Sequence, residues 1–315
     1  MYSNLELYQS FIFNHIEKYK DDSEQYCEFV SSRGLAKSCK KYQYPLVSSS
    51  TYIDPILFDN LNYGDSVYIC TAALDNFVHN FLYKLIAPIV LVSGDSDDSI
   101  GNDINIPFHN MTKPISNDII NSILNSSLIL KWFPQNCLMT HQKIVSLPIG
   151  LDYHSMTTSY NSSLNQEYNI KKLIQIPLYK RKPMIYSNMH FNLNRGDRQE
   201  AYDKINKNII YYESTQVDRY ESFKKQIEYA FVLSPYGMGP DCHRTWEALV
   251  LGCIPIIQSS NMDPLFNDLP VLLVNDWSDL TLEILEQTLQ KFSTMNFNKE
   301  KLNLNYYVNQ FNYMY

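Results

Sequence analysis

Short apolar runs rich in β-branched residues alternate with helical patterns along this chain, and this alternation limits the fold more than any other feature. The run SVYICT at 66–71 precedes an amphipathic pattern at 74–86 and a second apolar run, IVLVS, at 89–93. A strand, a helix and a strand in this order form a βαβ unit with parallel strands and a right-handed crossover. The first part of the chain is therefore predicted to contain a parallel sheet.

The same alternation continues and then restarts after an interruption. An amphipathic helix is expected at 5–19, and a helix at 118–125 precedes strands at 128–132 and 143–148. Residues 151–182 are rich in Ser, Asn, Tyr and Lys with little periodicity, which predicts a linker. The second block predicts strands at 183–188, 209–212, 231–234, 253–258 and 271–274, and helices at 198–207, 220–229, 242–251, 280–292 and from 299 onward.

The two blocks predict an α/β protein with two Rossmann-like domains that face a cleft. We place an acceptor-side domain at 1–165, a second α/β domain at 166–298, and a C-terminal helix at 299–315 that could pack back on the first domain. A length of 315 residues suits two domains. Ligands in such folds bind beyond the carboxyl ends of the strands, so functional residues are sought there.

Charge and hydropathy exclude several classes of protein. There are 26 Lys and Arg against 33 Asp and Glu, for a formal net charge of −7, which argues against a general nucleic-acid binder. The sequence has no apolar run of the ~18 residues that a membrane span needs. The first residues lack a basic segment followed by an apolar core, so we expect a cytoplasmic protein without a signal peptide.

The segment FVLSPYGMGPDCHRTWEALVLGCIPII at 231–257 contains the strongest functional pattern. A strand ends at Ser234, a loop containing Gly237 follows, and a helix begins with His243 and Arg244 in its first turn. Free backbone N–H groups and the helix dipole attract an anion there, and a guanidinium suits phosphate oxygens. Glu247, three residues after Arg244, is an acceptor suited to a pair of ribose hydroxyls.

A less specific interpretation of this segment is also open. Arg244 and Glu247 could form a surface ion pair worth only tenths of a kcal/mol. The loop is neither GxGxxG nor GxxxxGK[ST], so neither the dinucleotide fingerprint nor the P-loop applies.

The same residues resemble the C-terminal signature of exostosin-like glycosyltransferases. In that signature an Arg and Glu-Ala-Leu precede a Gly-Cys-Ile-Pro-Val-Ile-type strand. Here Arg244, Glu247-Ala248-Leu249 and the run 252–257 occupy those places, and Trp277 follows the next predicted strand. The resemblance covers residues 231–277. It implies a GT-B fold in which the C-terminal domain holds a nucleotide-sugar, with Ser234, Tyr236, Gly237, His243, Arg244 and Glu247 on the donor.

A second patch supports a donor site. The strand at 183–188 ends at Asn188, and Arg195 and Arg198 fall just before or at the next helix. Sugar-nucleotide transferases of similar layout often place a phosphate-binding Arg at this point. The alternative is a solvated pair of Arg side chains beside Asp197, because surface ion pairs are common and weak.

The candidate base comes from the first block. A metal-independent transfer needs a base for the acceptor hydroxyl, and Asp95 and Asp97 follow the strand at 89–93. Like-charge repulsion in such a cluster raises at least one pKa. Asp75 and Asp152 are alternatives, and ordinary turn chemistry also explains the cluster. Asp95-Ser96-Asp97 is a DxD pattern as well, and its oxygen ligands could hold a divalent ion that bridges a diphosphate. The C-terminal signature favours GT-B, so no cofactor is expected to be required, and a divalent metal at this pattern is the alternative.

The sequence therefore predicts a glycosyltransferase that moves a sugar from a UDP- or GDP-sugar to a hydroxyl of a glycan or glycoprotein acceptor. Trp132, Tyr153 and His154 could line the acceptor side, although most aromatic residues must serve the core. A catalytically silent glycan-binding relative and a nucleotide-sugar hydrolase or epimerase remain the alternatives.

Overall fold

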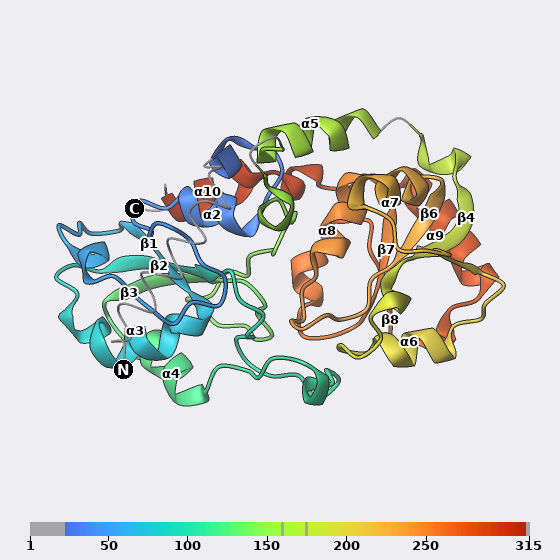
Figure 1. Cartoon of the computed structure of the whole chain (residues 1–315). Helices are drawn as coiled ribbons and strands as arrows, with labels where there is room; N and C mark the ends of the chain where they lie inside the picture. Colours follow the sequence, from blue (N-terminus) through green and yellow to red (C-terminus); the bar gives the residue numbers. More distant parts are fainter. Residues whose placement is uncertain (1–22, 159–160, 174–175, 313–315) are drawn as a thin grey trace, which may run out of the picture.

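The computed structural model describes residues 23–158, 161–173 and 176–312, and within them the chain forms two parallel sheets (Figure 1). The predicted α/β class and its parallel sheets are confirmed. The helix expected at 5–19 lies outside the described residues.

The first sheet has three strands, β1 (Ser66–Cys70), β2 (Ile89–Gly94) and β3 (Ile129–Pro134), in the order β1-β2-β3. Alternate side chains enter two different cores. Val67 and Ile69 pack with α3 (Leu74–Asn80) and α4 (Asn117–Asn125), whereas Tyr68 packs on the opposite face with α2 (Ser32–Lys37) and α10 (Leu304–Asn312). Because both faces are covered, the strands are mostly apolar, with few polar residues such as Lys131 in β3.

The second sheet has five parallel strands in the order β5-β4-β6-β7-β8. They are β4 (Lys182–Ser187), β5 (Ile210–Tyr212), β6 (Tyr229–Leu233), β7 (Ile254–Gln258) and β8 (Leu272–Val274). The helices around it are α6 (Arg198–Lys204), α7 (Arg219–Gln226), α8 (His243–Val250) and α9 (Leu282–Thr294). The strand order reverses between β4 and β6, and doubly wound sheets bind ligands beside such a switch point.

Single-turn 3₁₀ helices punctuate the connections. They span Ser23–Tyr26, Pro55–Phe58, Thr71–Ala73, Leu82–Lys84, Phe108–Asn110, His154–Met156, Leu178–Lys180, Met189–Phe191, Asp263–Phe266, Trp277–Asp279 and Lys299–Leu302.

Three predicted elements were wrong or misplaced. The helix expected at 74–86 ends at Asn80 and continues only as a 3₁₀ turn. The strand expected at 143–148 is reduced to one isolated bridge from Ile144 to Trp132. The expected linker contains α5 (Ser163–Leu173), which buries the polar Gln166 and Glu167 beside Ile170 and therefore shows no clear apolar periodicity.

The last helix packs against the first sheet although it follows the second in sequence (Figure 1). The Asn312 amide accepts a hydrogen bond from Ser66 Oγ at 2.5 Å and donates one to the Ser38 carbonyl at 2.9 Å. The Phe311 ring meets the Phe133 ring edge to face, with centroids 5.8 Å apart. No helix of the described residues is long and apolar enough to cross a membrane.

Candidate functional site

Two cavities lie at the start of α8, where Arg244 lines one and His243 the other. The first, which we call the arginine pocket, has a volume of about 210 Å³. It opens beyond the carboxyl ends of β4 and β5 and is lined by Asn188, Met189, Phe191, Asn192, Arg198, Glu213, Thr215, Gln216, Val217 and Arg244. The sheet topology thus brings two of the sequence-predicted arginines together beside the switch point.

Backbone carbonyls hold the two guanidinium groups of the arginine pocket. Arg244 donates from Nη2 to the Pro235 carbonyl at 2.9 Å, while its buried Nε has no hydrogen-bond partner in the described part of the chain. Arg198 donates to the carbonyls of Tyr236 at 3.3 Å and Asn192 at 3.2 Å. Burial, together with the charge of Arg244, lowers the pKa of Arg198 to about 10. Two cations in one partly desolvated pocket favour an anionic ligand.

A hydrogen-bonded chain fixes the opposite wall. Asn188 Nδ2 donates to Ser222 Oγ at 3.0 Å, and Ser222 Oγ lies 2.7 Å from the Tyr186 hydroxyl. The Tyr186 hydroxyl donates to Glu213 Oε1 at 3.3 Å, and the Tyr211 hydroxyl donates to Oε2 at 3.1 Å. This wall is therefore preorganised.

The buried carboxylate of Asp197 anchors the loop between β6 and α8 by hydrogen bonds. Asp197 accepts hydrogen bonds from the Tyr236 backbone N–H at 2.7 Å and from Trp277 Nε1 at 2.8 Å. Burial raises the pKa of Asp197 to about 6. A Cβ at Gly237 would lie 3.6 Å from Arg198 Nη2, so the loop passes directly over the guanidinium. Asp197 thus supports the arginine pocket and is not a surface partner of the arginines.

Two other predicted donor residues face the core. The buried Ser234 hydroxyl bonds to Thr245 Oγ1 at 2.8 Å. The Tyr236 hydroxyl donates to the Gln258 carbonyl at 3.0 Å, and its ring is 3% exposed. Neither side chain lines the arginine pocket.

Glu247 and Arg195 also lie outside the lining of the arginine pocket. Glu247 forms an ion pair with Arg219, whose other nitrogen donates to the Asp152 carbonyl. Arg195 is exposed, and its charge acts on both Arg198 and Asp97. Arg244 and Glu247 therefore do not line the same cavity, and the Glu247 carboxylate pairs with Arg219 instead.

The second cavity, which we call the histidine cavity, has a volume of about 160 Å³ and is lined by Ser32, Ser48, Ser49, Asp95, Ser96, Asp97, Ile149, His154 and His243. It collects side chains from loops after β2 and β3 and from the first residue of α8. The loop containing Gly239 packs closely on the backbone of Asp97, since a Cβ on Gly239 would lie 2.9 Å from the Asp97 carbonyl oxygen.

The two predicted bases differ in surroundings. Asp95 is buried, accepts from Ser48 Oγ at 2.7 Å, and lies 3.4 Å from Arg33 Nε in an ion pair. Asp97 is exposed at the cavity mouth, yet the surrounding protein desolvates its carboxylate enough to raise its pKa, against the opposing charge of His243. Asp97 is thus the carboxylate available to a substrate. No group of three metal-ligating side chains is found within residues that the structure describes.

Both histidines of the cavity are oriented through Nδ1. His243 Nδ1 lies 2.7 Å from the Gly150 carbonyl oxygen, so in the neutral ring Nδ1 carries the proton. His154 Nδ1 lies 3.2 Å from Asp152 Oδ1, and burial lowers the pKa of His154 to about 4. The charges of both histidines and Arg219 hold the pKa of Asp152 below its usual value. His154 is therefore neutral near pH 7, with Asp152 as its ionised partner.

The remaining candidate residues from the sequence are either buried in the core or far from both cavities. Trp132 is fully buried and donates to Ser93 Oγ at 2.9 Å, and the buried Tyr153 hydroxyl donates to Glu167 at 2.9 Å. Asp75 lies exposed on α3 beside His79. None of the three lines either cavity.

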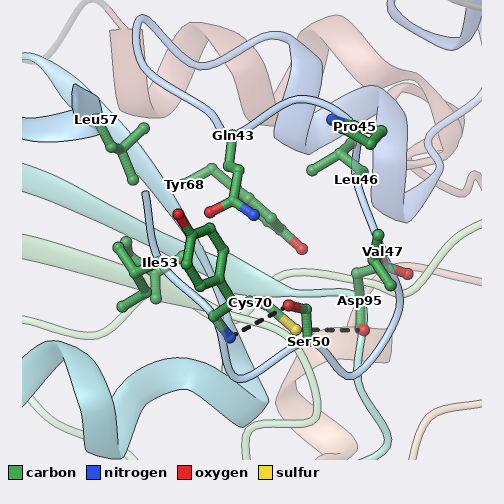
Figure 2. A pocket seen from close by; sticks show the side chains of 12 residues that line it. Gln43, Pro45, Leu46, Val47, Ser50, Ile53, Leu57, Tyr68, Cys70 and Asp95 are labelled. Carbon is green, nitrogen blue, oxygen red and sulfur yellow. Dashed lines mark hydrogen bonds between the residues drawn. The ribbon is translucent and has the colours of Figure 1, made fainter. Parts of the chain in front are cut away.

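A third cavity also contacts Asp95, and Figure 2 shows it between the apolar side chains of Leu46, Val47, Ile53 and Leu57. Its volume of about 20 Å³ has room for about one water molecule. It is too small for a sugar.

A scan against models of known protein families and a search of curated proteins both returned no match to this chain. Functional interpretation therefore depends on the two cavities. Sequence reasoning missed Glu213 in the arginine pocket, and it missed that His154 of the histidine cavity pairs with Asp152. Glu213 directly follows β5, so the rule of searching beyond strand ends could have found it.

Proposed function

We propose that this chain is a glycosyltransferase of GT-B-like arrangement, related to the exostosin-like enzymes, that uses a nucleoside diphosphate sugar. The observation that carries the proposal is the arginine pocket, in which Arg198 and Arg244 lie in the first turns of α6 and α8, the helices that follow the adjacent strands β4 and β6 at the switch point of a parallel sheet. A diphosphate supplies the negative charge that two neighbouring guanidinium groups favour.

The chemistry divides between the two cavities. The acceptor oxygen bonds to the anomeric carbon of the donor sugar, and the bond from that carbon to the diphosphate oxygen breaks. The acceptor proton passes to Asp97 in the histidine cavity, while Arg198 and Arg244 stabilise the charge on the departing diphosphate. A raised pKa suits Asp97 to this role, because an ordinary aspartate is a weak base at neutral pH.

The positions of His243 and Arg244 support this division. They are adjacent at the start of α8 but line different cavities, so the helix start lies between the proposed donor and acceptor sites. A sugar attached to a diphosphate on Arg244 would need to extend only past this turn to approach Asp97.

The test combines nucleotide binding with a transfer assay. Calorimetry with UDP and GDP should show binding to the wild type, a loss of at least tenfold in Arg244→Ala, and no loss in Lys224→Ala, which removes the same charge from an exposed site on α7. A panel of UDP- and GDP-sugars with simple glycan acceptors should then give a glycosylated product.

Each outcome bears on a different part of the proposal. Absence of UDP and GDP binding in the wild type overturns it. Donor consumption without acceptor product indicates a hydrolase, and glycan binding without donor turnover indicates a silent relative.

A further inference from the structure

Glu213 is a nearly buried carboxylate in the arginine pocket for which the proposed chemistry has no role. It directly follows β5, is 8% exposed, and lines the pocket with Arg198 and Arg244. A carboxylate in such a position is costly unless hydrogen bonds satisfy it. Its surroundings therefore indicate what it can bind.

The carboxylate of Glu213 has unused acceptor capacity. An ionised carboxylate offers about four acceptor positions on two oxygens. The hydroxyls of Tyr186 and Tyr211 each donate to a different oxygen, at 3.3 and 3.1 Å. Each oxygen thus keeps a further lone pair, and the two oxygens together can accept from two neighbouring hydroxyl groups.

The place of Glu213 in the fold matches this chemistry. β4 opens the second sheet, the loop after it leads to Arg198, and β5 pairs in parallel with β4. In doubly wound folds an acidic residue near the end of the strand after the phosphate-binding loop accepts from ribose hydroxyls. Glu213 occupies that place relative to Arg198.

Glu247, the carboxylate that the sequence favoured for this role, is engaged elsewhere. Its Oε1 pairs with Arg219, which also bonds to the Asp152 carbonyl, and Glu247 does not line the arginine pocket. Releasing Glu247 would break a partly buried ion pair, whereas Glu213 needs no rearrangement.

We propose that Glu213 accepts hydrogen bonds from the 2′- and 3′-hydroxyl groups of the ribose of a nucleoside diphosphate whose phosphates lie on Arg198 and Arg244. This inference rests on the proposed function, since it names how that donor site recognises its nucleotide. It makes the site selective for ribonucleotides over deoxyribonucleotides.

The experiment measures this selectivity by calorimetry with UDP, GDP and their 2′-deoxy counterparts. A hydrogen bond to a charged group corresponds to about tenfold or more in affinity. The wild type should therefore bind the ribonucleotide at least tenfold more tightly than the deoxynucleotide. Glu213→Gln should reduce that ratio to near one, and the matched control Glu247→Gln should keep it.

The ratio of ribonucleotide to deoxynucleotide affinity within each variant does not depend on how much of the protein is active. Glu213→Asp is a second variant, which keeps the negative charge but moves the carboxylate back from the pocket by one methylene. It should also lose the preference. A wild type that binds both nucleotide forms equally, or a Glu213→Gln protein that keeps the preference, overturns the assignment of Glu213 but leaves the proposed function standing. A wild type that binds no nucleotide overturns both.

Discussion

Asp241 links the loop before α8 to the loop after β3, and replacing it with Asn should change how stability depends on pH. Its Oδ2 accepts from the Ile149 backbone N–H at 2.8 Å, and both carboxylate oxygens lie 2.9 Å from Trp246 Nε1. Burial nevertheless raises the pKa of Asp241 to about 6. The bonds to the charged form offset only part of the desolvation.

The direction of this pH dependence follows from the difference between the pKa of Asp241 in the folded state and its pKa in the unfolded state. Because the folded-state pKa exceeds the unfolded value of about 3.9, Asp241 contributes stability that is present below pH ~4 and is lost as pH rises through 6. For these two values the loss between pH 5.0 and 7.5 is about 1.4 kcal/mol. Asp241→Asn removes this titration, while the other ionisable groups, including Asp197, remain in both proteins.

Urea unfolding of both proteins at the two pH values measures the effect. The free energy of unfolding of the wild type, relative to Asp241→Asn, should fall by about 1.4 kcal/mol from pH 5.0 to 7.5. A difference between the two proteins that does not change with pH, or that grows in favour of the wild type, refutes the reasoning.

Three further changes test other parts of the structure. Asp97→Asn should slow sugar transfer about 100-fold or more with unchanged UDP affinity, and retained transfer would exclude it as the base. Asp95→Ala should lower the free energy of unfolding by about 3 kcal/mol, because it breaks a buried ion pair, and a change under about 1 kcal/mol would contradict that assignment. Gly150→Ala should cost about 2 kcal/mol or more, since φ is 67° and the new Cβ would lie 2.2 Å from the Val30 carbonyl oxygen. Gly101→Ala, also at positive φ but beside the Met139 side chain, is the control; equal losses in urea unfolding would rule out the clash.

Local patterns predicted the sheets because the central strands are short apolar runs that are buried along most of their length, as in β2, β6 and β7. The residues 254–258 pair in parallel with both neighbours, and their apolar character reflects that burial. The helix α5 escaped prediction because its buried side chains include two polar residues, Gln166 and Glu167, and the Glu167 carboxylate accepts from the backbone N–H of the sequence-distant Phe29. Burial satisfied by long-range hydrogen bonds leaves no periodic signal.

The candidate site was predicted in part for a similar reason. Arg198 and Arg244 were found because each follows a strand whose end could be recognised. The side chain of Glu247 was expected on a ligand from its helical spacing to Arg244 and from the resemblance to the exostosin-like signature, but neither could reveal that Arg219, on another helix, pairs with it. Likewise, nothing local distinguishes Asp95, in an ion pair with Arg33, from Asp97 at the cavity mouth.

The most direct test of the account is a crystal structure of the protein with UDP or GDP bound. We predict diphosphate oxygens within hydrogen-bond distance of the guanidinium groups of both Arg198 and Arg244, with the ribose in the arginine pocket. An ordered nucleotide bound elsewhere, with both guanidinium groups still bonded only to the carbonyls of the protein, would contradict the central claim.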